Sequence, residues 1–217
     1  MKQIKFVSVG ESNIGKTKFF NLLLKIEEKN ISYTPTIGVS YFSYDKYISY
    51  IRYKCKFWDT GGGKTFQILI DTYLKESDAC ILFFDYKNNN SLQFITEQIE
   101  IFYKINPEII LLAVGFNYNH KELSNTDLLH FMKTKKYLDI LKTNNIPIFN
   151  LHCFTHFGIK DLMDKMICKF IKICHEKNIF IKDKEPSFAE ELNKKENKQS
   201  FFEKIKDIMC CSCCYIA

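Results

Sequence analysis

One short stretch of this 217-residue chain combines glycines, a lysine and a hydroxyl group at the spacing of a phosphate-binding loop. Residues 10–17 read Gly-Glu-Ser-Asn-Ile-Gly-Lys-Thr and fit the pattern G-x-x-x-x-G-K-[ST] in full. Glycines in such a loop let backbone N–H groups turn towards phosphate oxygens at the positive end of a helix dipole. We expect the Lys16 ammonium to lie between the β- and γ-phosphates of a nucleotide and the Thr17 hydroxyl to ligate Mg²⁺. The alternative, a turn that merely caps a helix, is disfavoured because pattern and context agree.

Two more stretches carry groups that serve a phosphate or a metal. Asp59 stands at the end of a strand-like run and is followed by three glycines at positions 61–63. An acid at that place can hold Mg²⁺ through a water molecule, and Gly62 offers a backbone N–H to a γ-phosphate. Thr36 adds a hydroxyl group in a loop before the second expected strand.

Alternating strand-like and helix-like runs must position these groups. Continuous apolar or β-branched runs predict strands, and apolar side chains three to four residues apart predict helices. The expected strands are residues 4–9, 41–48, 51–58, 80–85 and 109–115, and the expected helices are 18–28, 91–103, 127–141 and 159–173. This alternation indicates an α/β fold with a mostly parallel sheet, in which 41–48 and 51–58 pair as a hairpin. Ligands of such sheets bind at the carboxyl ends of the strands, in the loops after Val9, Trp58, Asp85, Gly115 and Phe149.

Composition indicates a globular domain followed by a tail. The chain is 46% hydrophobic, which is enough for a core, and no run approaches the roughly 18 apolar residues of a membrane-spanning helix. The first residues enter a strand-like pattern at once, so we expect no signal peptide. Residues 182–209 hold seven lysines and seven acidic residues with few apolar ones. We therefore expect one domain at 1–177 and a flexible tail at 178–217.

Cysteine usage and charge limit the environment and the partners. Five of the nine cysteines are scattered through the apolar body, and four lie within the last eight residues. The scattered ones are expected to be buried, reduced thiols; they are Cys55, Cys80, Cys153, Cys168 and Cys174. The net charge of +6 is modest and diluted by acids, so nucleic acid is not an expected partner.

The motifs together resemble those of a Rab-type small GTPase of the Ras superfamily. The family's W-D-T-A-G-Q-E stretch aligns without gaps onto Trp58–Lys64. Its S-T-I-G-V segment aligns onto Pro35–Val39, which follows Thr34, with Pro35 at the Ser position and Thr36 at the Thr position. Its Y-Y-R-G-A-x-x-x-x-x-x-Y-D stretch aligns onto Tyr73–Asp85. The resemblance covers roughly residues 1–177.

The resemblance implies a fold, ligands and two moving segments. The fold would be the P-loop small GTPase sandwich, a mostly parallel six-stranded sheet with helices on both faces. The ligands would be GTP or GDP with Mg²⁺, which Thr17, Asp59 through a water, and in the triphosphate state Thr36 would hold. Two switch loops, at about 31–42 and 60–76, would order around the γ-phosphate and relax on its loss.

Two residues depart from the family close to the phosphates. Gly63 stands where the family has the glutamine that orients the attacking water, so the catalytic set is Lys16, Thr36 and a degenerate Gly63. The family also relies on an arginine from a partner, and Arg52 lies in the wrong segment to supply one within the chain. Asn13 replaces a glycine where a positive φ is often wanted, although Asn tolerates that conformation. We therefore expect very slow intrinsic hydrolysis and a protein that rests mostly with GTP bound.

The base-reading loop departs from the family's N-K-x-D. Without a gap, Phe116 replaces the Asn, Asn117 the Lys and Asn119 the Asp; shifted by one residue, Asn117 is retained and His120 falls at the Asp position. Neither alignment keeps the carboxylate that accepts two hydrogen bonds from guanine. We expect guanine preference to weaken about 10- to 100-fold, which makes xanthine or adenine nucleotides conceivable. The alternative is that His120 or Asn119 is simply a solvated loop residue.

A second base loop is partly kept, with Cys153 at the Ala and Phe154 at the Lys of the family's E-T-S-A-K segment. The contact expected there is mainly a backbone N–H, which any residue retains. The complete expected nucleotide site is Glu11, Ser12, Asn13, Ile14, Gly15, Lys16, Thr17, Thr36, Asp59, Gly62, Asn117, Asn119, Cys153 and Phe154.

The last residues predict lipidation. Cys214-Tyr215-Ile216-Ala217 fits C-a-a-X with a terminal Ala, which favours a farnesyl group, while Cys213 and Cys214 together resemble doubly geranylgeranylated tails. A zinc site is disfavoured because four cysteines within five residues do not easily surround a tetrahedral ion. Residues 182–209 carry no net charge, so a second lipid on Cys210, Cys211 or Cys213 is the expected second anchor.

These observations predict a Rab-like, GTP-binding switch with slow hydrolysis in vesicle trafficking. It would be a monomer on the cytoplasmic face of an intracellular membrane, exchanging with the cytosol. Its partners would be an exchange factor, a GTPase-activating protein, a prenyl transferase, and effectors that bind residues 37–60 and 64–76. The alternative is a membrane-anchored pseudo-GTPase scaffold that binds nucleotide without turnover. A kinase with the same loop would need lid arginines, and Arg52 is the only arginine.

Overall fold

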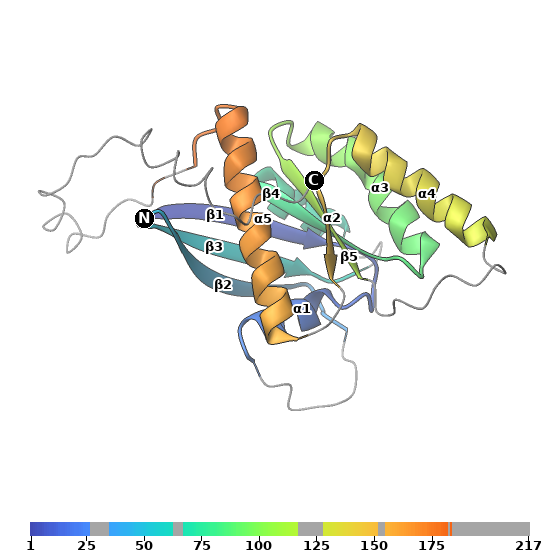
Figure 1. Ribbon diagram of the computed structural model, residues 1–217, viewed down its shortest axis with the longest axis horizontal. Helices are drawn as coiled ribbons and strands as arrows, with labels where there is room; N and C mark the ends of the chain where they lie inside the picture. Colours follow the sequence, from blue (N-terminus) through green and yellow to red (C-terminus); the bar gives the residue numbers. More distant parts are fainter. Residues whose placement is uncertain (27–34, 63–66, 117–127, 152–154, 182, 184–217) are drawn as a thin grey trace, which may run out of the picture.

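The computed structural model describes residues 1–26, 35–62, 67–116, 128–151, 155–181 and 183 (Figure 1). Strands and helices alternate along the chain as the sequence predicts. In chain order they are β1 (Lys2–Val9), α1 (Lys16–Leu23), β2 (Val39–Ile48), β3 (Ile51–Thr60), α2 (Gln67–Lys75), β4 (Ala79–Asp85), α3 (Asn89–Ile105), β5 (Ile110–Phe116), α4 (Leu128–Thr143), β6 (Ile148–Leu151) and α5 (His156–Glu176).

The strands form one six-stranded sheet in the order β2-β3-β1-β4-β5-β6. Among the strand pairs in the described residues, only β2–β3 is antiparallel, and it is the hairpin expected from the sequence. Its turn places Ser49 and Tyr50 at φ values of 47° and 64°, the left-handed conformation of a tight hairpin turn. The α/β fold with a mostly parallel six-stranded sheet is therefore confirmed.

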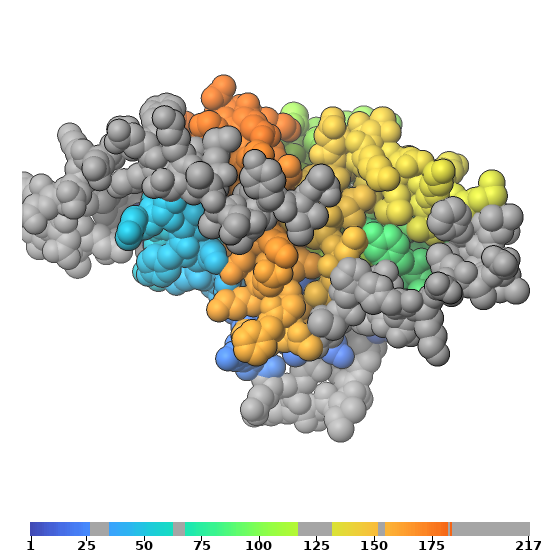
Figure 2. Space-filling view, in the orientation of Figure 1, coloured from blue at the N-terminus to red at the C-terminus, as the bar shows by residue number. Residues whose placement is uncertain are grey.

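Helices cover both faces of the sheet. In Figure 1, α5 crosses the near face with α1 beside its first turns, and α3 and α4 lie side by side on the other face. Figure 2 shows α5 at the surface between the β2–β3 hairpin and α4. No helix in the described part of the chain is long and apolar enough to cross a membrane.

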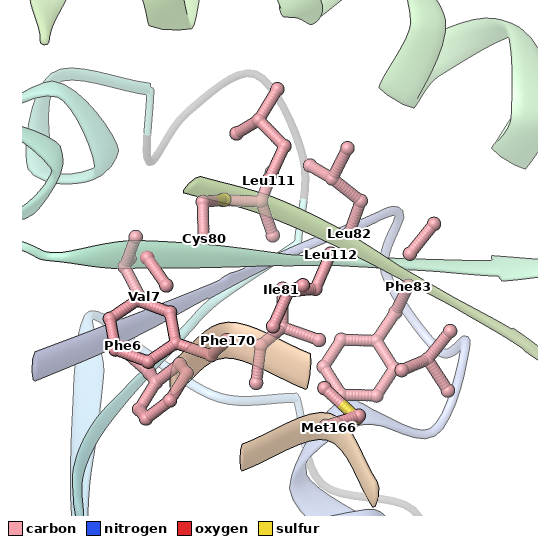
Figure 3. Close-up of a cluster of buried hydrophobic side chains, with 14 of the residues drawn as sticks. Phe6, Val7, Cys80, Ile81, Leu82, Phe83, Leu111, Leu112, Met166 and Phe170 are labelled. Carbon is pink, nitrogen blue, oxygen red and sulfur yellow. The ribbon is translucent and has the colours of Figure 1, made fainter. Parts of the chain in front are cut away.

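The core consists of two apolar layers, one on each side of the sheet. Figure 3 shows Phe6 and Phe83 pointing towards Met166 and Phe170 of α5, whereas Leu82 points to the opposite face. Strands β4 and β5 are buried along almost their whole length, as strands between two helical layers must be. The cysteines of the body that the structure describes, Cys55, Cys80, Cys168 and Cys174, are buried, reduced thiols, as expected; Cys153 lies outside the described residues.

Two expected segments are corrected. The first helix begins at Lys16 rather than at residue 18, because Gly15 supplies a left-handed N-cap (φ 102°). It ends at Leu23, because Lys25 adopts φ 55° and the Ile26 N–H donates to the Asn21 carbonyl, which closes the last turn. The expected switch loop at 60–76 is not a loop throughout, since α2 occupies Gln67–Lys75.

After α5 ends at Glu176, the described residues still contact the domain. Lys2 donates to the Ile181 carbonyl (3.2 Å) and to the Asp183 carboxylate (2.9 Å), so Ile181 and Asp183 contact the start of β1. The expected boundary near residue 178 stays a prediction. The cysteines of the C-terminus, Cys213 and Cys214 among them, lie outside the described residues.

Candidate functional site

The phosphate loop joins the end of β1 to the start of α1. Asn13 adopts φ 60°, the left-handed conformation that the sequence comparison with glycine suggested. Gly10 packs against β4, where an added Cβ would lie 2.6 Å from the Phe83 carbonyl oxygen. The residues expected to bind phosphate, 11–15, therefore follow a strand and the closely packed Gly10, and they lead into a helix N-terminus, as the motif requires.

Lys16 turns its ammonium group back over this loop. Its Nζ donates to the carbonyls of Gly10 (2.9 Å) and Glu11 (2.8 Å), and the residue is only 5% exposed. Burial lowers the pKa of Lys16 to about 8, and the charges of Asp59 and Glu11 oppose that shift. The ammonium is thus held over the loop that is expected to bind phosphate, which suits it to bind an anion.

Three oxygen-bearing side chains from separate segments meet beside Lys16. The Thr17 hydroxyl donates to Oδ2 of Asp59 (2.5 Å) and lies 2.8 Å from the Thr36 hydroxyl. Because the single Thr17 proton goes to Asp59, the Thr36 hydroxyl must be the donor in the second bond. The structure therefore brings together the three residues that the sequence predicted as metal ligands.

Asp59 is fully buried at this point. Ser8 of β1 donates to its Oδ1 (2.8 Å), and the neighbouring Thr60 hydroxyl donates to the Ser8 carbonyl (2.7 Å). Burial raises the pKa of Asp59, while the hydrogen bonds from Thr17 and Ser8 and the Lys16 charge oppose this. Ser8 belongs to no motif, and its one signal in the sequence is a hydroxyl within the apolar run 4–9.

The glycines after Asp59 contact both neighbouring segments. The Gly61 N–H donates to the Gly38 carbonyl (2.9 Å), which ties the start of the second switch segment to the segment that carries Thr36. Gly62 lies so close to the phosphate loop that an added Cβ would come within 2.3 Å of the Ser12 nitrogen. Only glycine permits this approach.

The base end of the site is only partly described. Phe116 ends β5, is fully buried and stacks on Phe83 with ring centroids 5.6 Å apart. In the ungapped alignment it would replace the family's Asn, and here it is a core side chain. Asn117, Asn119, Cys153 and Phe154 lie outside the described residues, as does Gly63.

One contact at the phosphate loop has no counterpart among the sequence predictions. Asn88, whose side chain caps α3, donates to the Glu11 carboxylate (3.1 Å). An N-cap Asn is recognisable in a sequence, but its contact with a loop 77 residues away is not.

The residues present suit a magnesium ion. Two hydroxyls and a carboxylate form an all-oxygen set, which hard divalent cations prefer, and they adjoin an ammonium group placed for phosphate. Thr17, Thr36 and Asp59 would hold the ion.

Residues 5–120, more than half of the chain, match the family model described as "Ras of Complex, Roc, domain of DAPkinase". The matched range contains the phosphate loop, Thr36, Asp59 and Gly62, and it ends within the base-reading loop.

Proposed function

The chain belongs to the Roc family of Ras-like GTPase domains, and from the motifs at Trp58–Lys64 and Tyr73–Asp85 we propose that it is a Rab-type switch that binds GTP·Mg²⁺ and hydrolyses it very slowly. GTP binding and a switch-like function follow from the family. Thr17, Thr36 and Asp59 meet next to the buried Lys16, and this is the observation that supports a Mg²⁺·nucleotide site at these residues.

Each residue of the site has a proposed task. Lys16 stabilises negative charge on the β- and γ-phosphates, and the backbone N–H groups of residues 11–15 bind their oxygens. Thr17 and Thr36 ligate Mg²⁺, and Asp59 orients a water of the ion. When bound, Mg²⁺ supplies charge neutralisation across the phosphates. Thr36 and Gly62 lie on segments joined through Gly38 and Gly61, so loss of the γ-phosphate would release both segments together.

Slow hydrolysis is proposed from Gly63. A glycine has no side chain with which to orient the attacking water, and the one arginine, Arg52, is paired with Asp45 (2.7 Å) on the β2–β3 hairpin. Any acceleration therefore has to come from a partner.

Effector binding is proposed for residues 37–60 and 64–76. Ile37 and Ile68 are 88% and 79% exposed. Trp58 of β3 contacts Tyr41 of β2 and Tyr73 of α2, each at 5.9 Å between ring centroids. Apolar groups exposed beside the γ-phosphate site suit a partner that senses the nucleotide state. A vesicle-trafficking role on the cytoplasmic face of an intracellular membrane, with lipids on Cys213 and Cys214, completes the proposal.

A second candidate is a pseudo-GTPase scaffold. Gly63 and the altered base-reading loop favour it, whereas the assembled Lys16, Thr17 and Asp59 favour a site that still binds Mg²⁺ and nucleotide. The two differ in whether nucleotide turns over.

Chromatography of the nucleotide released from the purified, Mg²⁺-containing protein tests the proposal. We expect GTP, because hydrolysis is too slow to empty the site of it. Bound GDP would show that hydrolysis persists and would contradict the account of Gly63. ATP or a xanthine nucleotide would support the altered base reading, and an empty, folded protein would leave only the scaffold.

The variant Gly63→Gln tests the reason for slow turnover. The added amide should raise the single-turnover hydrolysis rate by roughly tenfold or more. Gly63→Ala is the matched control, because it changes the backbone preference without adding an amide. Equal rates in both variants would refute the role assigned to position 63.

A further inference from the structure

Ser8 is a hydroxyl residue within the apolar strand β1, and it lies next to the proposed metal site. The parallel register places Ser8 directly opposite Asp59 of β3, so both side chains leave the sheet on the same face. Ser8 is 1% exposed and Asp59 is 0% exposed. Their contact is therefore closed to bulk water.

The geometry gives the two Asp59 oxygens different partners. Oδ1 accepts a hydrogen bond from Ser8 (2.8 Å), and Oδ2 accepts one from Thr17 (2.5 Å). A carboxylate rotates about its last bond with little resistance unless its oxygens are distinguished. Ser8 holds Oδ1 and thereby keeps Oδ2 directed towards Thr17, whose hydroxyl contacts that of Thr36.

The strand itself is held at this point by a second bond. The Thr60 hydroxyl donates to the Ser8 carbonyl (2.7 Å), so β1 and β3 are joined through side chains immediately beside the carboxylate. Ser8 cannot shift away from Asp59 without breaking this contact as well. Its hydroxyl is a rigid, dry donor of the kind that orients metal ligands from behind.

We propose that Ser8 is a positioning residue for the metal site, which holds the Asp59 carboxylate in the orientation that Mg²⁺·nucleotide binding requires. This inference rests on the proposed function, since it presupposes that Asp59 serves a magnesium ion. It assigns to β1 a part in metal binding in addition to its part in the sheet.

The experiment measures Mg²⁺ affinity in the full chain loaded with a fluorescent GDP analogue. The rate of nucleotide release is followed as free Mg²⁺ is varied, with excess EDTA as the metal-free limit.

Ser8→Val and Ser8→Thr form the central pair, because the two side chains have the same shape and only one carries a hydroxyl. Ser8→Val should raise the half-saturating Mg²⁺ concentration roughly 10- to 100-fold, as loss of an outer-shell partner does. Ser8→Thr should stay near the wild-type value.

Two further measurements separate positioning from stability. In excess EDTA all variants should release the analogue at the same rate, because the hydroxyl acts through the metal. Ser77→Ala removes another buried hydroxyl, bonded to the Tyr73 carbonyl (2.8 Å) and remote from the site, and it should leave the Mg²⁺ dependence unchanged. If the extra methyl groups prevent folding, Ser8→Ala against wild type gives the same comparison.

The outcomes distinguish this inference from the proposed function. Equal Mg²⁺ dependence in Ser8→Val and Ser8→Thr, with a wild type that needs Mg²⁺ to retain nucleotide, overturns the role of Ser8 alone. A wild type whose nucleotide retention ignores Mg²⁺ overturns both.

Discussion

At the scale of single residues, the site holds two buried ionisable side chains, whose charged forms are costly to remove from water. Lys16 and Asp59 are both buried. Burial lowers the pKa of Lys16 and raises the pKa of Asp59, so in each case it favours the neutral form. Hydroxyl groups and loop carbonyls offset part of that cost. A phosphate and a divalent cation would complete the compensation, so ligand binding should be strongly coupled to stability.

Lys16 gives the nucleotide-free protein a predictable pH dependence. Folding lowers its pKa from 10.5 to about 8, so the unfolded chain binds more protons between these pH values. The free energy of unfolding should therefore rise from pH 8 towards 10.5, by on the order of 1–3 kcal/mol in total. Urea unfolding of wild type and Lys16→Met at several pH values measures it. A rise of the same size in Lys16→Met would show that other groups cause it.

Gly62→Ala should weaken triphosphate binding more than diphosphate binding. The added Cβ would lie 2.3 Å from the Ser12 nitrogen and 2.4 Å from its Cα, so the second switch segment would have to move off the phosphate loop. We expect the ratio of GTP to GDP affinity to fall about tenfold, the equivalent of ~1.4 kcal/mol. Competition with a non-hydrolysable GTP analogue measures it, and Ile68→Ala, an exposed change on α2, is the control. An unchanged ratio would contradict the proposed contact.

At the scale of elements, the edge strand that follows Thr36 is fastened to the last helix. Tyr44 and Lys46 of β2 donate to the two oxygens of Asp164 on α5, at 2.9 and 2.6 Å. Burial and the contact with Asp164 raise the pKa of Tyr44, so the phenol stays a donor at every physiological pH. The β2–β3 hairpin is thereby held against α5.

Asp164→Ala should lower the free energy of unfolding by about 1–2 kcal/mol, because two donors lose a partly buried partner. Asp161→Ala is the matched control: its pair with Lys165 on the same helix is more exposed and should be worth less than about 0.5 kcal/mol. Urea unfolding with nucleotide bound measures both. Equal losses would mean that the link from β2 to α5 adds no stability.

At the scale of the whole molecule, nucleotide binding and membrane attachment are proposed for different parts of the chain. Every described site residue lies within residues 8–62, whereas the lipidation cysteines lie in the last eight residues. The last described residue, Asp183, contacts Lys2 at the start of β1. The phosphate loop follows the opposite end of the same strand. We therefore expect the proposed lipidation of the tail to leave nucleotide binding unchanged.

A chain that ends at Asp183 should keep its nucleotide and its thermal midpoint and should not associate with membranes. In the full chain, Cys213→Ser with Cys214→Ser should abolish prenylation, whereas Cys210→Ser with Cys211→Ser should retain it. Mass spectrometry of the C-terminal peptide and sedimentation with membranes measure the two effects. An unmodified wild-type tail would refute the anchor.

The sequence alone determined the fold class, most elements and the phosphate loop. Residues 10–17 are contiguous, so their chemistry follows from local backbone geometry, and the buried strands at β4 and β5 are visible as unbroken apolar runs. The tertiary structure decided what depends on register and packing. It set Ser8 opposite Asp59, brought Thr36 to Thr17, turned Phe116 into the core and placed a helix within the second switch segment. Those contacts join residues far apart in the chain, and their geometry is fixed only when the sheet and both helical layers pack together.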